Sequence, residues 1–584
     1  MVENRRVRRP SPAASSLSFA EVEIFRGRIN AISDEMAIVL ARTSMSPVIY
    51  EVLDFSCGIC GPDGRLISQA NGITAFTGIY AHLIKAIRRK YGHNIRPGDM
   101  FITNDPFVGH THTADVAVID PVFFEGGIVA FAVSIAHWAE LGGAVPGSLS
   151  PTASEIYQEG LRFNSLKLFR EGYREENIFD LIRLNVRLPE MTLGDLQAEI
   201  ASVRIGALRI RELCERYGSG KLELAFQEIL KVGEAVGRRS VAALPNGSYL
   251  AQDWIDGDGL SSDPIPIQVA VTIANDLMTV DFTGSSAQRN SPLNCTKGAL
   301  EAAVCTIFKA IVDPVRALND GCFKALKIIV PDGTIFSAQK PAATGWYYEV
   351  TAHAIDLVWR ALAPILSARI GVGHYLSLCV SYIGGKDPKT QLPFVVVEPH
   401  VGGWGARAGS DGENALIGVT DGQSCNYSIE LFETKYPIRI NEYSLNTAEA
   451  AGPGEFRGGL GTVREYEMTA EDCFMYASAG RSVHKPWGYN DGGEGSSNIV
   501  ELIRNGTVQR AARMPYTPLN KGDRFRVLTS SGGGYGNASE RSKAAIRSDV
   551  KRGYVDRKTA RHLYGYVEFD GNQNLPEPLI DRGS

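Results

Sequence analysis

Two apolar runs around a short glycine turn constrain the fold of this chain more than any other feature. Residues 116–124 (VAVIDPVFF) and 128–136 (IVAFAVSIA) are rich in β-branched and aromatic side chains, and Glu125-Gly126-Gly127 lies between them. Strand-forming runs joined by a glycine turn predict a β-hairpin. Asp115 precedes the first run and His137 follows the second. A hairpin of this length would therefore return His137 to the side of Asp115.

The residues at the open end of this hairpin have the chemistry of a metal site. His112 lies three residues before Asp115, and His110 stands two residues before His112. Neutral imidazole nitrogen and carboxylate oxygen are ligands of borderline and hard cations. The sequence therefore predicts a divalent-metal site formed by His112, Asp115 and His137. The alternative is that these side chains only hydrogen-bond to the backbone near turns, since the segment carries no compact HExxH-type motif on one helix.

Composition sets the broad class of the protein. A chain of 584 residues is too long for one hydrophobic core, and roughly two to four domains are expected. A net charge of -5 does not indicate binding to nucleic acid or to an anionic membrane. No apolar run reaches the roughly 18 residues of a membrane span. Nine cysteines, an odd number, indicate reduced thiols and a cytoplasmic location.

The pattern of elements predicts an α+β (mixed α/β) multidomain fold. We expect a disordered tail over 1–17 and an N-terminal α/β domain over 18–245, which holds the metal site and a helical segment. A glycine-rich mixed α/β domain follows over 246–465, and a β-rich C-terminal domain with a terminal helix covers 466–584. The glycine-rich loops contain no GxxxxGK[ST] sequence, so no P-loop for a nucleotide is predicted.

Three polar residues in the helical segment have two interpretations. Asp195, Gln197 and Glu199 stand near the expected start of a helix, and they could point toward a site. The preferred interpretation is that they cap the helix and form a solvated face.

Many motifs in one order resemble the B subunit of the hydantoinase/oxoprolinase family, from about residue 19 to 567. They begin with LDFSCGICGPDGRLISQ, RPGDMFITNDPFVGHTHTADVAVIDPVF and AHWAELGGAVPGSLSPTASEIYQEGLR. VDFTGSSAQ, AGPGEFRGGLGTVREYE, PWGYNDGGEG and KGDRFRVLTSSGGGYGNASER continue the series, and RKTARHLYG ends it. The series identifies the family and leaves the substrate open.

The resemblance implies an activity and a partner. Relatives include ATP-dependent 5-oxoprolinases, hydantoin and lactam hydrolases, and acetone and acetophenone carboxylases. In these systems a hydantoinase A-like subunit binds ATP and phosphorylates the substrate, and several B-type subunits carry a metal. The matching ligand positions are His112, Asp115 and His137, with Asp105 as the next candidate. We therefore expect a hetero-oligomeric enzyme with an ATP-binding partner, which uses a divalent Zn, Fe or Mn ion.

Two departures from the commoner family pattern bear on the substrate. Where many members read GGTH, this chain has His110 in place of the second glycine, and where many read AHHADIGG it has Trp138 and Glu140. We expect His110 and Trp138 to contact the substrate. Asp105 or Glu140 is expected to act as the catalytic general base or to orient a metal ligand.

The predicted reaction is hydrolysis of a cyclic amide C–N bond, of the 5-oxoproline, hydantoin or lactam type. Metal-activated water would open a ring that the partner has phosphorylated. The first alternative is the subunit of an ATP-dependent ketone carboxylase of the acetone or acetophenone type. The second is a non-catalytic scaffold subunit for the ATP-binding partner.

Overall fold

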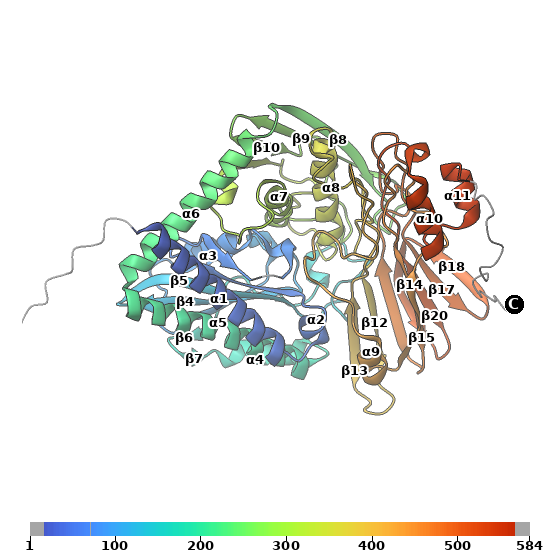
Figure 1. The fold of residues 1–584 in the computed structure, drawn as a ribbon. Helices are drawn as coiled ribbons and strands as arrows, with labels where there is room; N and C mark the ends of the chain where they lie inside the picture. Colours follow the sequence, from blue (N-terminus) through green and yellow to red (C-terminus); the bar gives the residue numbers. More distant parts are fainter. Residues whose placement is uncertain (1–16, 71, 567–584) are drawn as a thin grey trace, which may run out of the picture.

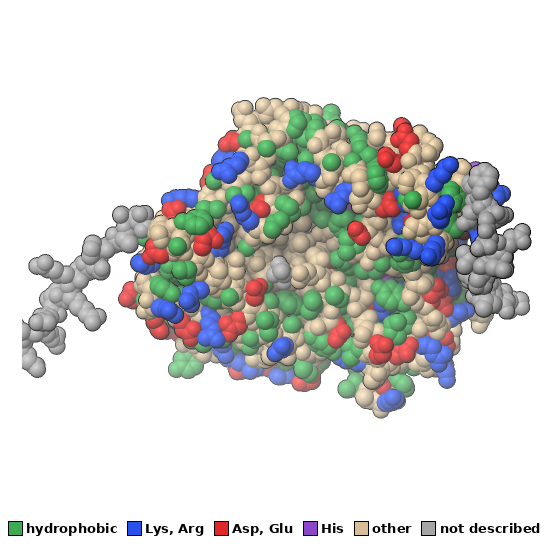
Figure 2. All heavy atoms as spheres, viewed as in Figure 1, with side chains coloured by type: hydrophobic (Ala, Val, Ile, Leu, Met, Phe, Trp, Pro, Cys, Tyr) green, Lys and Arg blue, Asp and Glu red, His purple; other side chains and the backbone are tan. Residues whose placement is uncertain are grey.

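The structure, a computed structural model, describes residues 17–70 and 72–566. Helices and β-sheets alternate along the chain in several layers (Figure 1), so the predicted mixed α/β multidomain class is confirmed. Of the tail predicted over 1–17, residues 1–16 lie outside the described residues. Positive and negative side chains are interspersed on the face that Figure 2 shows, in keeping with the small net charge of -5.

The N-terminal part is built on a seven-stranded antiparallel sheet in the order β2-β1-β5-β4-β3-β6-β7. The predicted hairpin forms its two longest strands, which lie near the centre of the sheet. The strands are β1 (Phe55–Cys60), β2 (Leu66–Gln69), β3 (Met100–Thr103), β4 (Asp115–Phe124), β5 (Gly127–His137), β6 (Leu166–Arg170) and β7 (Tyr173–Arg174).

Helices cover both faces of this sheet, because its central strands are apolar on both sides. Val116 and Val118 of β4 join the cluster of buried residues that includes α1 and α5, whereas Ala117 and Ile119 join the cluster around α3. Ser18 and Glu21 form a reciprocal capping box that starts α1. The helices of this part are α1 (Phe19–Thr43), α2 (Pro47–Tyr50), α3 (Tyr80–Tyr91), α4 (Glu176–Asn185), α5 (Pro189–Tyr217) and α6 (Ser219–Ala242).

A second, four-stranded sheet follows α6 in the order β11-β10-β9-β8. Two largely buried helices, α7 (Lys297–Val312) and α8 (Tyr347–Leu366), pack on each other, and α8 also packs on β8 and β9. The first turn of α8 reaches the open end of the N-terminal hairpin, where Tyr347 contacts Asp115. The strands are β8 (Gly247–Ile255), β9 (Ile265–Ala274), β10 (Leu277–Asp281) and β11 (Leu326–Ile329).

Two further sheets form the C-terminal part, as the predicted β-rich sequence requires. The four-stranded sheet consists of β13 (Pro393–Glu398), β12 (Ser381–Lys386), β16 (Cys473–Ser478) and β19 (Arg513–Leu519), in this spatial order. The five-stranded sheet consists of β14 (Ile438–Leu445), β15 (Thr462–Met468), β20 (Arg524–Leu528), β17 (Ile499–Arg504) and β18 (Thr507–Ala511). The helices here are α9 (Ile429–Lys435), α10 (Lys543–Arg552) and α11 (Arg557–Tyr564).

The boundary predicted near residue 245 falls between α6 and β8. One cluster of buried apolar side chains runs from Val22 to Val527 and includes residues on both sides of this boundary. The predicted division into domains stays a prediction. In the described part of the chain, no helix has the length and the apolar character needed to cross a membrane.

Glycine-rich loops pack against one another between the strands of the C-terminal half. A Cβ atom on Gly532 would stand 2.1 Å from the carbonyl oxygen of Trp404, and one on Gly403 would stand 2.2 Å from that of Gly459. Only glycine lets two backbones approach so closely. At these two positions, therefore, close packing of loop against loop accounts for the glycine.

Candidate metal centre

The hairpin register places Asp115 and His137 side by side. The two residues are cross-strand partners at the open end of β4 and β5. Their ladder continues from there to the turn, with one irregularity between Val122 and Phe123. β5 also pairs with β1, and the backbone N–H of His137 donates to the carbonyl of Asp54, just before that strand, at 3.0 Å. The predicted return of His137 to Asp115 is therefore confirmed.

His112 reaches the same point from the loop between β3 and β4. Its Nδ1 lies 2.8 Å from the carbonyl oxygen of Gly345, the partner to which an imidazole N–H donates. The neighbouring threonines fix the loop, since Thr111 Oγ1 donates to Asp115 Oδ2 at 2.5 Å and Thr113 Oγ1 donates to the Glu159 carbonyl at 2.7 Å. A proton on Nδ1 leaves the Nε2 lone pair of His112 directed toward Asp115 and His137.

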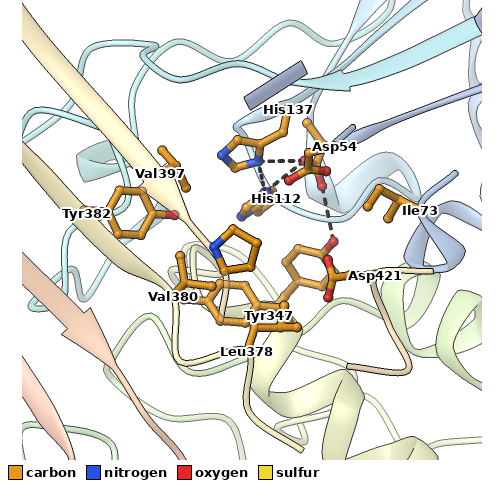
Figure 3. A pocket seen from close by; sticks show the side chains of 13 residues that line it. Asp54, Ile73, His112, His137, Tyr347, Leu378, Val380, Tyr382, Val397 and Asp421 are labelled. Atoms are coloured by element: carbon orange, nitrogen blue, oxygen red, sulfur yellow. Dashed lines mark hydrogen bonds and ion pairs between the residues drawn. The ribbon is translucent and has the colours of Figure 1, made fainter. Parts of the chain in front are cut away.

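Three candidate ligand atoms form a nearly equilateral triangle (Figure 3). His112 Nε2 lies 3.0 Å from Asp115 Oδ1, His137 Nδ1 lies 3.1 Å from the same oxygen, and the two nitrogens are 3.2 Å apart. Ligand atoms about 2.1 Å from a tetrahedral zinc-type ion stand about 3.4 Å from each other. The trio His112, Asp115 and His137 therefore has the spacing and the donor set that a divalent ion requires.

All three side chains are buried, and their charges are mutually stabilising. Burial disfavours the charged form of Asp115, but His112 and His137 outweigh it and hold the pKa of this carboxyl well below its usual range. Burial likewise acts against a charged His112, but the charge and hydrogen bond of Asp115 raise its pKa. A second imidazole, that of His137, shares this carboxylate, and a cation that bound here would displace the Nε2 proton of His112 and use its lone pair.

The trio opens into a pocket with mostly apolar walls (Figure 3). Most of the walls come from residues 347–421. Two further carboxyl groups line the same space. Burial raises the pKa of both Asp54 and Asp421 to about 7, with a further contribution from the charge of Asp115. Besides the trio, the lining residues are Asp54, Ile73, Tyr347, Tyr348, Leu378, Val380, Tyr382, Val397, Pro399 and Asp421.

The two residues predicted as catalytic bases have other partners. Asp105 Oδ1 accepts from the backbone N–H of Phe107 at 3.1 Å and caps the 3-10 turn at Pro106–Val108. Glu140 accepts from the backbone N–H groups of Gly142 and Gly147 and pairs with Arg187 at 3.0 Å. Neither side chain lines the pocket. The geometry gives each a loop-stabilising contact, and the proton transfer expected of them stays a prediction.

The two residues predicted to contact substrate also lie outside the pocket lining. His110 is fully buried, its Nδ1 accepts from the backbone N–H of Thr111, and burial lowers its pKa to about 4. The indole N–H of Trp138 donates to Glu199 Oε1 at 2.7 Å.

The solvated face predicted for Asp195 and Glu199 is wrong, because both side chains are buried. Asp195 instead accepts the backbone N–H groups at the start of α2.

Sequence reasoning missed Asp54, Asp421 and the three tyrosines of the pocket. Asp54 carried a local signal, because it immediately precedes a strand that pairs with the strand ending at His137. Asp421 and the tyrosines carried none. They follow the trio by more than 200 residues. The packing of α8 and β12 brings the tyrosines to it, and a loop that contacts residues 72–75 brings Asp421.

The contact between Trp138 and Glu199 gives a test that separates stability from substrate binding. We expect Trp138→Phe to lower the free energy of unfolding by about 1–3 kcal/mol, because it leaves a buried carboxyl oxygen without its donor. The rate with substrate should stay within about twofold of the wild type. Chemical denaturation and steady-state kinetics measure the two effects. Trp254→Phe, at a side chain 44% exposed, serves as the matched control. A changed KM with unchanged stability would instead favour the predicted substrate contact.

Comparison with known proteins gives one consistent family. The hydantoinase B/oxoprolinase family model matches residues 19–538. The B-type subunit of a putative D-/L-hydantoinase from Pseudomonas sp. (strain NS671) is 30% identical over 571 residues, which cover 94% of this chain and 95% of the relative.

Two solved structures share the fold. The ATP-dependent caprolactamase from Pseudomonas jessenii matches with a TM-score of 0.89 and 26% identity, over 95% of this chain and 98% of that chain. A nucleotide-free acetone carboxylase matches with a TM-score of 0.86 over 94% of this chain and 79% of that chain. At 18% identity, the second likeness shows the fold alone.

Proposed function

Because the chain belongs to the hydantoinase B/oxoprolinase family, we propose that it is the B-type subunit of an ATP-dependent enzyme that hydrolyses a cyclic amide. The observation that carries the proposal is the buried trio His112, Asp115 and His137 at the end of an apolar-walled pocket. Two of the similar proteins are named for hydantoin and caprolactam, which are both cyclic amides. An apolar wall suits the carbon skeleton of such a ring.

The same comparison supports the proposal of a second subunit. The hydantoinase relative is named as one subunit of its enzyme, and the caprolactamase is described as ATP-dependent. This chain has no P-loop sequence. We therefore assign ATP use to a hydantoinase A-like partner in a hetero-oligomer. The partner would transfer phosphate to the amide oxygen, which turns a poor electrophile into a reactive one.

The residues of this chain would bind and open the activated ring. His112 Nε2, Asp115 Oδ1 and His137 Nδ1 would hold a divalent Zn, Fe or Mn ion, which supplies Lewis acidity and a water of lowered pKa. Thr111 and Tyr347 donate to Asp115 Oδ2, so that Oδ1 stays turned toward the imidazoles.

Two carboxyl groups complete the proposed site. The charges of His137 and Asp115 both act on Asp54, whose carboxyl group lines the same pocket, so this group is suited to be a further oxygen ligand. We assign to the Asp421 carboxyl the protonation of the ring nitrogen as the C–N bond breaks. In the whole reaction, water adds to the phosphorylated carbon, the amine leaves with this proton, and hydrolysis releases the phosphate.

The experiment combines this chain with its co-expressed partner subunit. With ATP and a panel of 5-oxoproline, hydantoin and a lactam, we expect one ring to open and ADP to form in proportion. The purified chain alone should contain about one divalent ion per molecule by elemental mass spectrometry. Omission of ATP or of either subunit serves as the control.

Two outcomes would contradict the proposal. Label from bicarbonate in an acid-stable product, with acetone or acetophenone as substrate, would establish the carboxylase alternative. Full activity of the partner without this chain would establish the scaffold alternative.

A further inference from the structure

Glu159 is a buried carboxyl group outside the trio and outside the pocket lining. It follows the short 3-10 turn Ile156–Gln158, and its side chain is fully buried. Its Oε1 accepts from the backbone N–H of Gly345 at 2.6 Å and of Thr344 at 3.0 Å. Among the described residues, no lysine or arginine forms an ion pair with Glu159. A buried carboxyl group held by backbone donors alone is costly to keep charged, so its position calls for a reason.

The turn that Glu159 holds is the turn that holds His112. The carbonyl oxygen of Gly345 lies 2.8 Å from His112 Nδ1. One residue of the turn thus has its N–H fixed by Glu159 and its C=O fixed on the imidazole. The next residues start α8, where the Tyr347 hydroxyl reaches Asp115 Oδ2 at 3.3 Å.

Glu159 also fixes the loop of His112 from the other side. Its main-chain carbonyl accepts from Thr113 Oγ1 at 2.7 Å, one residue after His112. The carboxylate packs directly on the turn, because a Cβ atom on Gly345 would stand 2.9 Å from Glu159 Oε1. Little room remains for the turn to take another position.

We propose that Glu159 is a positioning residue that keeps His112 in the Nδ1–H tautomer, through Gly345, so that Nε2 faces Asp115 and His137. The inference rests on the proposed function in one respect, namely that a metal ion uses this Nε2. Partners that orient a metal-binding histidine typically change metal affinity by about 10–100-fold when they are replaced. Here the orienting carboxylate acts through one residue of backbone.

Glu159→Gln tests the proposal with little change in volume. If the glutamine oxygen keeps the two bonds of Oε1, its NH2 group takes the place of Oε2 and faces the Thr344 N–H, whose 3.2 Å bond to Oε2 is lost. We expect Co²⁺ affinity, measured by competition with a chromophoric chelator, to fall by about 10–100-fold, with a changed visible absorption spectrum of bound Co²⁺. Glu155→Gln is the matched control, because Glu155 lies in the same loop and is exposed.

A second readout needs no metal. In the metal-free protein labelled with ¹⁵N-histidine, the signal that disappears in His112→Ala identifies His112. At a pH high enough to keep the His112 imidazole neutral, we expect this signal to show a protonated Nδ1 in the wild type and a mixture of tautomers in Glu159→Gln. Gly345→Ala, which displaces the carboxylate while retaining Glu159, should shift the same signal and weaken Co²⁺ binding in the same direction.

The outcomes separate this inference from the proposed function. Wild-type Co²⁺ affinity and an unchanged His112 signal in folded Glu159→Gln or Gly345→Ala would overturn the positioning role alone. A wild-type protein that takes up no Co²⁺ would contradict the proposed function and the metal-binding part of this inference, and the ¹⁵N signal would still decide the tautomer. If Glu159→Gln does not fold, the Co²⁺ affinity and ¹⁵N signal of Gly345→Ala decide the positioning role.

Discussion

Replacement of His112 by alanine is expected to lower ATP-dependent ring opening by about 10³-fold, or about 4 kcal/mol of transition-state stabilisation. The variant loses one of three converging ligand atoms, the Nε2 that lies 3.0 Å from Asp115 Oδ1. The remaining carboxylate and imidazole form an open pair that retains a metal ion poorly. The measurements are turnover with the partner subunit and metal content of the purified chain.

The controls for His112→Ala keep loss of the ion distinct from loss of the fold. His93→Ala removes an exposed imidazole and should retain full activity and metal. Both variants should still unfold cooperatively in metal-free buffer, at a lower temperature for His112→Ala because it removes a buried partner of Asp115. Retention of wild-type turnover by His112→Ala, with no metal bound, would contradict the assignment of the trio.

Replacement of Arg481 by methionine is expected to lower the free energy of unfolding by about 3–5 kcal/mol. The Arg481 side chain is 2% exposed, and its Nη2 donates at 2.6 Å to Asp253 of β8 and to Asp356 of α8. Methionine fills much of the volume but leaves two buried carboxyl groups without their shared cation. The denaturant midpoint, followed by tryptophan fluorescence, measures the loss.

Two further variants make the Arg481→Met result interpretable. Arg439→Met removes a cation whose side chain is 61% exposed and 3.9 Å from Glu467, and it should cost less than about 1 kcal/mol. Asp253→Asn and Asp356→Asn, added to Arg481→Met, should restore part of the stability because they remove the unpaired charges. A triple variant as unstable as Arg481→Met itself would mean that lost packing, and not charge, explains the effect.

The trio was predictable because it depends on local geometry. The alternation of strand residues and a short turn set the cross-strand pairing of Asp115 and His137. The same alternation explains why the substrate contact predicted for Trp138 is not favoured. Adjacent residues along a strand point to opposite faces of a sheet, so Trp138, the residue after β5, reaches α5 and Glu199 while His137 faces the pocket. Asp105 before a proline likewise has the sequence pattern of a cap.

The walls of the pocket could not be predicted in the same way. Tyr347 begins α8, Val380 precedes β12 and Val397 belongs to β13. Apolar residues at these positions resemble ordinary core residues in sequence, and only tertiary packing distinguishes the few that border a cavity. Asp421 lies in a glycine-rich loop whose path depends on contacts with residues 72–75. The helices and strands could therefore be predicted more readily than the pocket that they form together.

Most of the pocket is assembled from two distant stretches of chain, residues 112–137 for the trio and residues 347–421 for most of the walls, and Asp54 and Ile73 complete it. The second stretch includes Tyr347 and Asp421, to which the proposal gives roles in the chemistry, but its apolar residues contact the pocket alone. Mutations at Leu378, Val380 or Val397 would reshape the proposed ring-binding space and leave the trio unchanged. Under the proposed function, substrate preference could then change from one cyclic amide to another without a change in the trio. Laboratory evolution of this preference should begin at these three positions.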